Sequence, residues 1–229
     1  MTDNASQEGV EPLTIDVVSD AVCPWCFVGK RRLDEALDGL PNVPVEIRWR
    51  PFQLDASIPR GGISRVDYLN RKFGPDRAHD MHARLTGVGA EAGIPFAFDR
   101  IARSPNTLDA HRLIRWAQST GRQSGLVERL FNAYFIEGRD IGDRDTLADI
   151  ADEFGLDRAA IRARLDTDDD LADVEGDIET AQRIGVTGVP FFILDGKYGL
   201  SGAQPSEALA AAIEKAYRAR GENAEIEGA

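Results

Sequence analysis

Both cysteines of this 229-residue chain lie in one tetrapeptide, CPWC, at residues 23–26. The preceding segment LTIDVVS (13–19) is rich in β-branched residues and predicts a strand, and the residues from about Pro24 to Asp38 predict a helix. A helix that begins near the first cysteine puts the two one turn apart, within the Cα separation of ~4.4–6.8 Å that a disulfide needs. The pair is therefore predicted to lie where a strand passes into a helix, and to close and open without large backbone movement.

The order of the other elements favours an α/β fold with a helical insertion. The segment VPVEIRWRPF (43–52) alternates apolar and polar residues and completes a β-α-β unit, which normally builds a parallel sheet. Residues 62–184 instead carry apolar stripes at helical spacing. VPFFIL (189–194), the turn DGK and YGLSG then predict a hairpin, and a last helix begins near Ser206 and runs to about Arg218. The expected order is β-α-β, helical block, β-β-α, with the two outer parts sharing one sheet.

These expectations divide the chain into three parts. The outer parts are residues 13–61 and 185–219, and the helical insertion is residues 62–184. Residues 1–12 and 220–229 are polar, and we expect both to be flexible tails.

The charge and the N-terminal segment limit the classes of partner and compartment. A net charge of −12 disfavours nucleic acid and anionic membranes. No run of apolar residues is long enough to predict a transmembrane helix. The first residues lack the basic start and apolar stretch of a secretory signal. We therefore expect a cytoplasmic protein, in a compartment where structural disulfides are rare.

Thiol chemistry is the function that the cysteine pair favours. The N-terminus of a helix favours a thiolate at Cys23, so we expect Cys23 to be the nucleophile and Cys26 to resolve the mixed disulfide. Pro24 suits the first helical position, and Trp25 offers an apolar surface beside the sulfurs. Two alternatives stay open: a pair of inert buried thiols, and a zinc site with His79 and His82, although those lie far along the chain. We expect no metal.

Val189-Pro190 is the second candidate part of the site. A proline that opens an apolar strand is unusual unless it lies at an edge or follows a cis bond. A cis bond would turn the Val189 backbone outward, where it could pair with an extended substrate by strand addition. An ordinary trans proline at the start of a strand is the alternative.

Four segments together resemble the DsbA-like thioredoxin-fold family, and most closely its FrnE-like branch, which is related to 2-hydroxychromene-2-carboxylate isomerases. They are SDAVCPWC, RWRPFQLD, SPNTLDAHRLIRWA and GVTGVPFFILDGKYGLSGAQP, and the likeness spans about residues 13–217. The resemblance implies a thioredoxin domain interrupted by a helical domain. It also implies a cis bond before Pro190, packed against the cysteines.

The same resemblance suggests roles for three polar residues. Asn106 and Thr107 match a family segment and are candidate cleft residues, although capping of the next helix is the simpler role. Related oxidoreductases carry a buried acid in the first strand, which makes Asp16 the candidate proton acceptor for Cys26. We expect Asp20 to start the helix or face solvent, and His111 to be structural.

The predicted function is a thiol–disulfide oxidoreductase that acts on protein or small thiols, with no required cofactor and with glutathione as a possible co-substrate. The alternatives are a glutathione-dependent isomerase or transferase, and a thiol-dependent chaperone. The isomerases usually carry serine where this chain has Cys23, so the presence of both cysteines favours disulfide exchange. Partners are expected to be thiols or disulfides rather than nucleic acid or membrane, and the protein a monomer or a homodimer.

Overall fold

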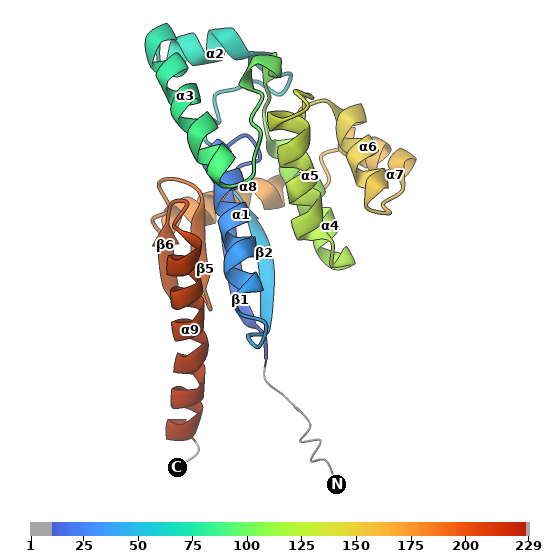
Figure 1. The fold of residues 1–229 in the computed structure, drawn as a ribbon. Coiled ribbons are helices and arrows are strands. Elements are labelled where there is room, and N and C mark those ends of the chain that lie inside the picture. Colours follow the sequence, from blue (N-terminus) through green and yellow to red (C-terminus); the bar gives the residue numbers. More distant parts are fainter. Residues whose placement is uncertain (1–10, 228–229) are drawn as a thin grey trace.

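A four-stranded mixed sheet forms the centre of the computed structural model, which describes residues 11–227 (Figure 1). The strand order is β2-β1-β5-β6. β1 (Leu13–Ser19) pairs in parallel with β2 (Val45–Pro51) and antiparallel with β5 (Phe191–Leu194), which continues through a tight turn into β6 (Tyr198–Ser201). The predicted order of strands and the sharing of one sheet by the two outer parts are thus confirmed.

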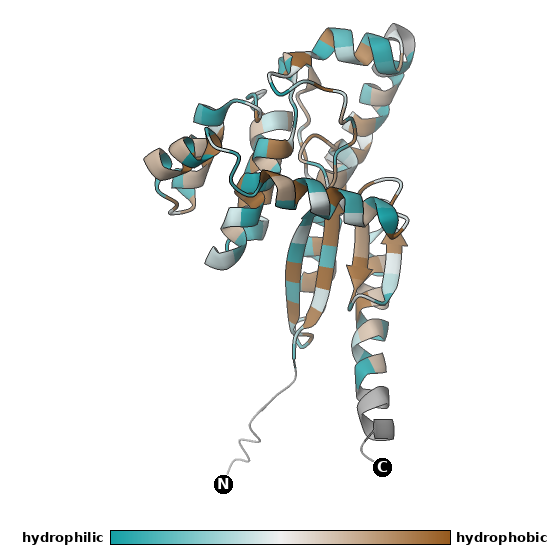
Figure 2. Ribbon diagram, turned by 180° about the vertical axis from the view of Figure 1, so that it is seen from behind, coloured by the Kyte–Doolittle hydropathy of each residue, from teal (hydrophilic) through white to brown (hydrophobic). Residues whose placement is uncertain are grey.

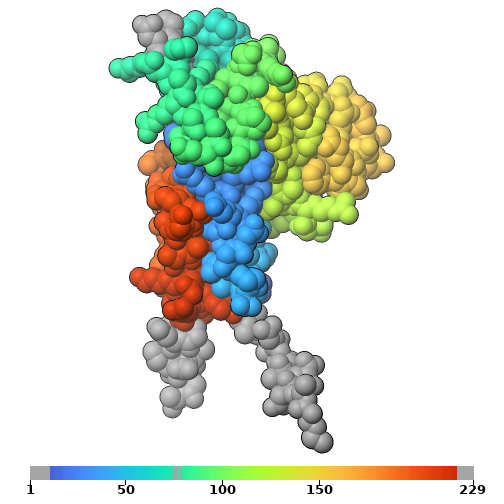
Figure 3. Space-filling model, viewed as in Figure 1, coloured from blue at the N-terminus to red at the C-terminus, as the bar shows by residue number. Residues whose placement is uncertain are grey.

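The two faces of the sheet have different covers. Alternate residues of β1, namely Leu13, Ile15 and Val17, belong to the main core, together with residues of α1 (Pro24–Asp38) and α9 (Ser206–Glu227). α9 lies along α1 on this face (Figure 3). Val18 belongs to a second cluster with residues at the end of α8, which packs against β2 on the other face. Apolar stretches run along the strands between these helices (Figure 2).

The segment between β2 and β5 is mainly helical, as predicted. Its core joins that of the sheet through aromatic side chains, with Phe27 of α1 stacked on Phe131 at 5.1 Å. Two-residue strands also form a small separate sheet, which was not expected from the sequence. The elements are β3 (Ile63–Ser64), α2 (Arg65–Lys72), α3 (Pro75–Glu91), the 3₁₀ turn η1 (Phe98–Arg100), β4 (Arg103–Ser104), α4 (Leu108–Ala117), the 3₁₀ turn η2 (Gln118–Thr120), α5 (Gln123–Phe135), α6 (Arg144–Glu153), α7 (Arg158–Leu165) and α8 (Leu171–Arg183).

The C-terminal end corrects one expectation. The last helix does not stop near Arg218 but continues through Glu227, so residues 220–227 belong to the helix rather than following it. Arg220 gives a physical reason, because its guanidinium pairs with Asp195 in the turn after β5 and donates to the carbonyl of Glu11 at 2.7 Å. Most of the predicted N-terminal tail lies outside the described residues. None of the described helices combines the length and the apolar character that crossing a membrane requires.

Candidate active site

The two cysteines lie at the start of α1, at the carboxyl end of β1. The chain leaves β1 through a turn in which the backbone N–H of Cys23 donates to the carbonyl of Asp20 at 3.0 Å. Cys23 is the N-cap of α1, Pro24 is in the first turn, and the N–H of Cys26 donates to the carbonyl of Cys23 at 3.0 Å. Both cysteines are free thiols. This is the i, i+3 arrangement that the sequence predicts.

Val189 and Pro190 follow the helical insertion along the chain and lie next to this end of α1. The peptide bond between them is cis, and the thiol of Cys23 donates to the carbonyl of Val189 over 3.6 Å. Pro190 is buried against α1 at Gly29, where a Cβ added to the glycine would lie 2.8 Å from Pro190 Cγ. The absence of a side chain at Gly29 therefore sets how closely the proline segment approaches the cysteine helix.

The two thiols have different environments. Burial raises the pKa of Cys26 well above its ordinary value, and the neighbouring Cys23 raises it further. The hydroxyl of Ser19 and the backbone of Asp20 oppose this shift by hydrogen bonding to the Cys26 sulfur. Cys26 therefore carries its proton at neutral pH and must lose it before it can act as a nucleophile.

Access to Cys23 is narrow, since only 3% of the residue is exposed. The half-buried residues Pro24, Trp25 and Val189 surround it. Trp25 thus lies beside Cys23, and its role at the rim of a substrate site stays a prediction.

Asp16 does not lie beside the cysteines, contrary to expectation. Its neighbours Ile15 and Val17 point into the core that contains Cys26, so the alternation of β1 directs Asp16 to the other face of the sheet. There its carboxylate forms an ion pair with Arg50 at 2.6 Å. The acid that adjoins the cysteine turn is Asp20, which is 1% exposed and therefore does not face solvent.

Asp20 joins the sheet to the helical insertion. One carboxylate oxygen accepts from the backbone N–H of Leu54 at 2.8 Å, and the other lies 3.5 Å from Nε2 of the buried His111 in α4. His111 Nε2 lies 2.9 Å from the carbonyl of Phe52. Sequence reasoning missed this pair because the two residues are far apart along the chain. The one available signal was a carboxylate three residues before Cys23.

The predicted cleft residues Asn106 and Thr107 differ in role. Asn106 holds the insertion together, because its amide donates to the carbonyl of Ile58 at 2.8 Å and its oxygen accepts from the N–H of Leu108 at 3.1 Å. It thus caps α4. The buried hydroxyl of Thr107 has no hydrogen-bond partner in the described part of the chain, and it lines a cleft between the insertion and the cysteine turn.

This interdomain cleft also contains a buried cation. Arg65 is 8% exposed, and among the side chains that the structure describes no carboxylate is recorded within 4.0 Å of its guanidinium. Its guanidinium donates a long hydrogen bond of 3.4 Å to the hydroxyl of Ser104 and lies 5.7 Å from the ring centroid of Tyr68. Asp20 and Val22, just before Cys23, form part of the same wall. Asp20, Arg65 and Thr107 line this cleft next to the cysteine motif, and each has a buried side-chain polar atom without a hydrogen-bond partner in the described part of the chain.

The alternative interpretation of the sequence was a zinc site formed by the two cysteines with His79 and His82. His82 stacks on Phe98 with ring centroids 4.4 Å apart. In the described residues, no group of three or more His, Cys, Asp or Glu side chains is placed to hold a metal ion.

Gly29→Ala tests the packing of Pro190 on α1. Alanine normally stabilises a helix by about 1 kcal/mol relative to glycine. Here the added methyl would overlap Pro190, and overpacking of this kind costs about 1–3 kcal/mol. We expect a lower free energy of unfolding and slower thiol exchange. Gly176→Ala in α8 is the matched control, because nothing lies within 4 Å of the position that its Cβ would take, and it should be neutral or stabilising. Equal stabilisation by both variants in urea unfolding would contradict the close contact.

The comparisons with known proteins agree with this geometry. A family model described as a DSBA-like thioredoxin domain matches residues 14–214. The uncharacterized protein YwbO of Bacillus subtilis (strain 168) is 31% identical over 182 residues, which cover 79% of this chain and 86% of YwbO.

Two solved structures extend the comparison. The crystal structure of the probable DsbA oxidoreductase SCO1869 from Streptomyces coelicolor has a TM-score of 0.81 and 33% identity, with 90% of each chain covered. The cytosolic disulfide reductase DsbM from Pseudomonas aeruginosa, solved with GSH, has a TM-score of 0.65 and 21% identity, with 90% of this chain and 99% of DsbM covered. At this identity the likeness supports a shared fold and nothing more. From the family match, the sequence identity and the fold together, the chain belongs to the family of DSBA-like thioredoxin-domain proteins.

Proposed function

We propose that the protein is a thiol–disulfide oxidoreductase in which Cys23 exchanges with the substrate and Cys26 resolves. The observation that carries the proposal is the pair of free thiols at the tip of α1, with the sulfur of Cys23 at 3.6 Å from the carbonyl of Val189. The position of Cys23 at the helix N-terminus supports its role as the first nucleophile.

The reaction has two exchange steps. The thiolate of Cys23 attacks a substrate disulfide, so that one substrate sulfur leaves as a thiolate and the other becomes joined to Cys23. The thiolate of Cys26 then attacks the sulfur of Cys23, which forms the Cys23–Cys26 disulfide and releases the second substrate thiolate. The substrate gains two electrons and the protein loses two, and a dithiol substrate reverses both steps. The backbone of Val189, whose carbonyl lies 3.6 Å from the sulfur of Cys23, would align an extended substrate segment.

Small thiols that carry a carboxylate are the substrate class that the interdomain cleft supports. A buried guanidinium without a counter-ion is costly, and a bound carboxylate would neutralise Arg65 while the hydroxyl of Thr107 donates to it. Asp20 offers an acceptor for an ammonium group on the same ligand. Glutathione has both groups, and the similar Pseudomonas reductase was solved with it. We therefore propose glutathione as a co-substrate. We also propose the cytosol as the compartment, because the Pseudomonas reductase is described as cytosolic.

Arg65→Met should weaken the use of glutathione without removing the thiol chemistry. Loss of a hydrogen bond to a charged group costs about 1.5–3 kcal/mol, which corresponds to a rise of roughly 10- to 100-fold in the KM for glutathione. Arg71→Met is the matched control, since Arg71 belongs to the same helix and is more than half exposed. Steady-state reduction of a small disulfide at several glutathione concentrations gives the KM for glutathione of each variant. Equal KM values for the two variants would contradict the carboxylate site.

Cys26→Ser separates this function from its alternatives. Disulfide turnover by the two-cysteine route should stop, because the mixed disulfide on Cys23 is no longer resolved from within the protein. A glutathione-dependent isomerase activity needs no second cysteine and would persist, as would the holding of unfolded chains. Assays of insulin reduction, of glutathione-dependent isomerisation and of the aggregation of an unfolded client, run on the same preparation, distinguish these outcomes. Undiminished insulin reduction by the variant would contradict the proposed two-step cycle.

A further inference from the structure

The interdomain cleft is lined by two buried side chains of opposite charge that do not pair with each other. Asp20 is 1% exposed and Arg65 is 8% exposed, and both belong to the lining. No ion pair within 4.0 Å joins the two, and among the described side chains the one basic group recorded within that distance of Asp20 is His111. Unpaired buried charges are costly, so a ligand that brings both signs of charge into the cleft would satisfy both residues.

The part of the cleft around Arg65 suits a carboxylate. Nε of Arg65 and the hydroxyl of Thr107 are buried and have no hydrogen-bond partner in the described residues. Thr107 is also the N-cap of α4, and its side chain makes no capping hydrogen bond, so the hydroxyl is available to a ligand. A guanidinium and the N-terminus of a helix both favour a negative group. A carboxylate placed there would therefore accept a hydrogen bond from each of the two side chains.

The part of the cleft around Asp20 suits an ammonium group. One carboxylate oxygen accepts from the N–H of Leu54 at 2.8 Å, whereas Oδ1 has no hydrogen-bond partner in the part of the chain that the structure describes. Nε2 of His111 lies 3.5 Å from Oδ1 but 2.9 Å from the carbonyl of Phe52, and since a carbonyl only accepts, the hydrogen of that nitrogen is engaged there. Oδ1 can thus accept one more hydrogen bond, and an ammonium group would donate it.

The position of the cleft limits the length of the ligand. Its lining includes Val22 but neither Cys23 nor Val189, and the sulfur of Cys23 lies 3.6 Å from the carbonyl of Val189. A thiol with its charged groups in the cleft must therefore extend past Val22 before its sulfur meets Cys23. In cysteine the amino and carboxylate groups adjoin the carbon that carries the sulfur, which is too short a span. In a γ-glutamyl thiol a side chain and a peptide bond separate them from the sulfur.

We propose that the interdomain cleft binds the free α-amino-acid group of a γ-glutamyl thiol such as glutathione, with its carboxylate on Arg65 and Thr107 and its ammonium group on Asp20. The inference rests on the proposed function and assigns the end of the molecule that the protein recognises. The glycine end of glutathione then lies outside the cleft, and the thiol faces Cys23. γ-Glutamylcysteine, which lacks the glycine, should serve equally well.

Thiols that differ in one charged group test this assignment on the wild-type protein. Steady-state reduction of a small aromatic disulfide gives a KM for each thiol. We expect γ-glutamylcysteine, and glutathione amidated at its glycine, to have the KM of glutathione. Acetylation of the amino group, or amidation of the γ-glutamyl carboxylate, should each raise the KM roughly 10- to 100-fold, which is the cost of losing a hydrogen bond to a charged group. Cysteine should also show a raised KM.

Two variants assign each charge to its residue. Asp20→Asn should use glutathione and its N-acetyl form with equal KM values but keep its preference for the γ-glutamyl carboxylate, and Arg65→Met should do the reverse. The comparison of thiols within one variant cancels any change in the overall rate. Asp55→Asn is the matched control, because Asp55 lines the same cleft but lies 3.9 Å from both Arg71 and Lys72. It should keep both preferences of the wild type.

A KM that rises on amidation of the glycine, or one that does not respond to loss of the γ-glutamyl charges, would overturn the assignment. So would variants of Asp20 and Arg65 that keep both preferences. The wild-type series decides the question if a variant does not fold. Dithiothreitol, a neutral dithiol, reports the exchange reaction without the cleft, so a wild type that fails to turn over with it would instead contradict the proposed function.

Discussion

Replacement of Cys23 by serine is expected to lower the rate of thiol–disulfide exchange by at least about 10³-fold, as removal of a nucleophile does. Serine is similar to cysteine in size and can still donate a hydrogen bond toward the carbonyl of Val189. Its hydroxyl, however, does not form a mixed disulfide with the substrate. Cys26 does not substitute for it, because burial raises its pKa and leaves it 1% exposed. Reduction of insulin and of a small aromatic disulfide would measure the loss.

Cys26→Ser is the matched variant, because it removes the other sulfur of the same helix. It should retain the first step and accumulate a covalent adduct with the substrate, visible by mass spectrometry, whereas Cys23→Ser should form none. Circular dichroism and urea unfolding would verify that both variants fold. An adduct on Cys23→Ser with retained turnover would show that Cys26 is the first nucleophile and would reverse the assignment.

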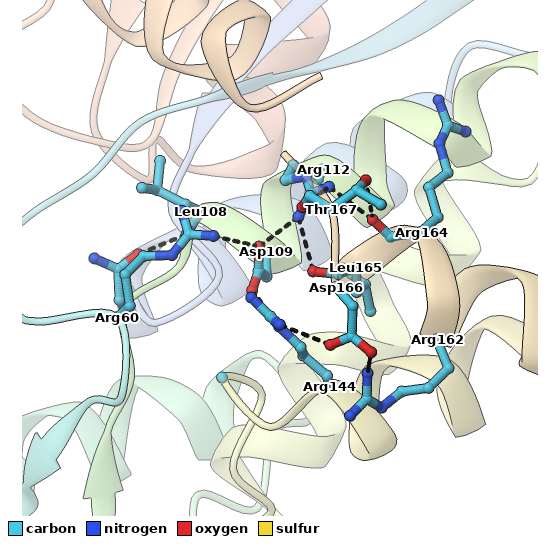
Figure 4. Close-up of polar contacts among 12 residues, drawn as sticks. Arg60, Leu108, Asp109, Arg112, Arg144, Arg162, Arg164, Leu165, Asp166 and Thr167 are labelled. Atoms are coloured by element: carbon cyan, nitrogen blue, oxygen red, sulfur yellow. Dashed lines mark hydrogen bonds and ion pairs between the residues drawn. The ribbon is translucent and has the colours of Figure 1, made fainter. Parts of the chain in front are cut away.

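The second large effect concerns stability. Arg112→Met is expected to lower the free energy of unfolding by about 3–5 kcal/mol, the range for removing one partner of a buried charged network. Arg112 of α4 is fully buried. Its guanidinium lies at the C-terminal end of α7, where main-chain carbonyls lack partners within the helix (Figure 4). Its acceptors are the carboxylate of Asp109 at 2.8 Å and the carbonyls of Arg164, Leu165, Thr167 and Asp169 at 3.0, 3.3, 2.9 and 2.7 Å.

Methionine would fill the space of the side chain but leave the four carbonyls without this donor. Asp109 would remain paired, since Arg60 and Arg144 also contact it. Arg115→Met, three residues along α4, is the control, because Arg115 is 38% exposed and such ion pairs contribute about 0–1 kcal/mol. Urea unfolding followed by circular dichroism compares the two midpoints. A loss of stability by Arg112→Met no larger than that by Arg115→Met would contradict a structural role for this network.

The fold around the cysteines was predictable because its signals are local. The strand before Cys23, the proline at the helix start and the alternation in β2 depend on neighbouring residues. The position of Asp16 was also open to local reasoning. Ile15 and Val17 are apolar, and period two then directs Asp16 to the other face, so this error came from weighting a family likeness above the strand pattern.

The rest of the site depends on long-range packing. Asp20 and His111 meet because the insertion lays α4 against the end of β2, and no pattern near either residue indicates the other. The buried cation at Arg65 and the capping of α7 by Arg112 arise in the same way. The extension of α9 follows from the pairing of Arg220 with Asp195, across the chain rather than along it.

Equilibration of the protein in buffers of reduced and oxidised glutathione tests the central claim most directly. After acid quench and alkylation of free thiols, mass spectrometry counts the molecules that carry two thiols, an internal disulfide or a bound glutathione. We predict a single two-electron transition from the dithiol to the Cys23–Cys26 disulfide, with a glutathione adduct on Cys23 as the minor species between them. Thiols that stay unmodified across the whole range, or separate adducts on each cysteine with no internal disulfide, would contradict it.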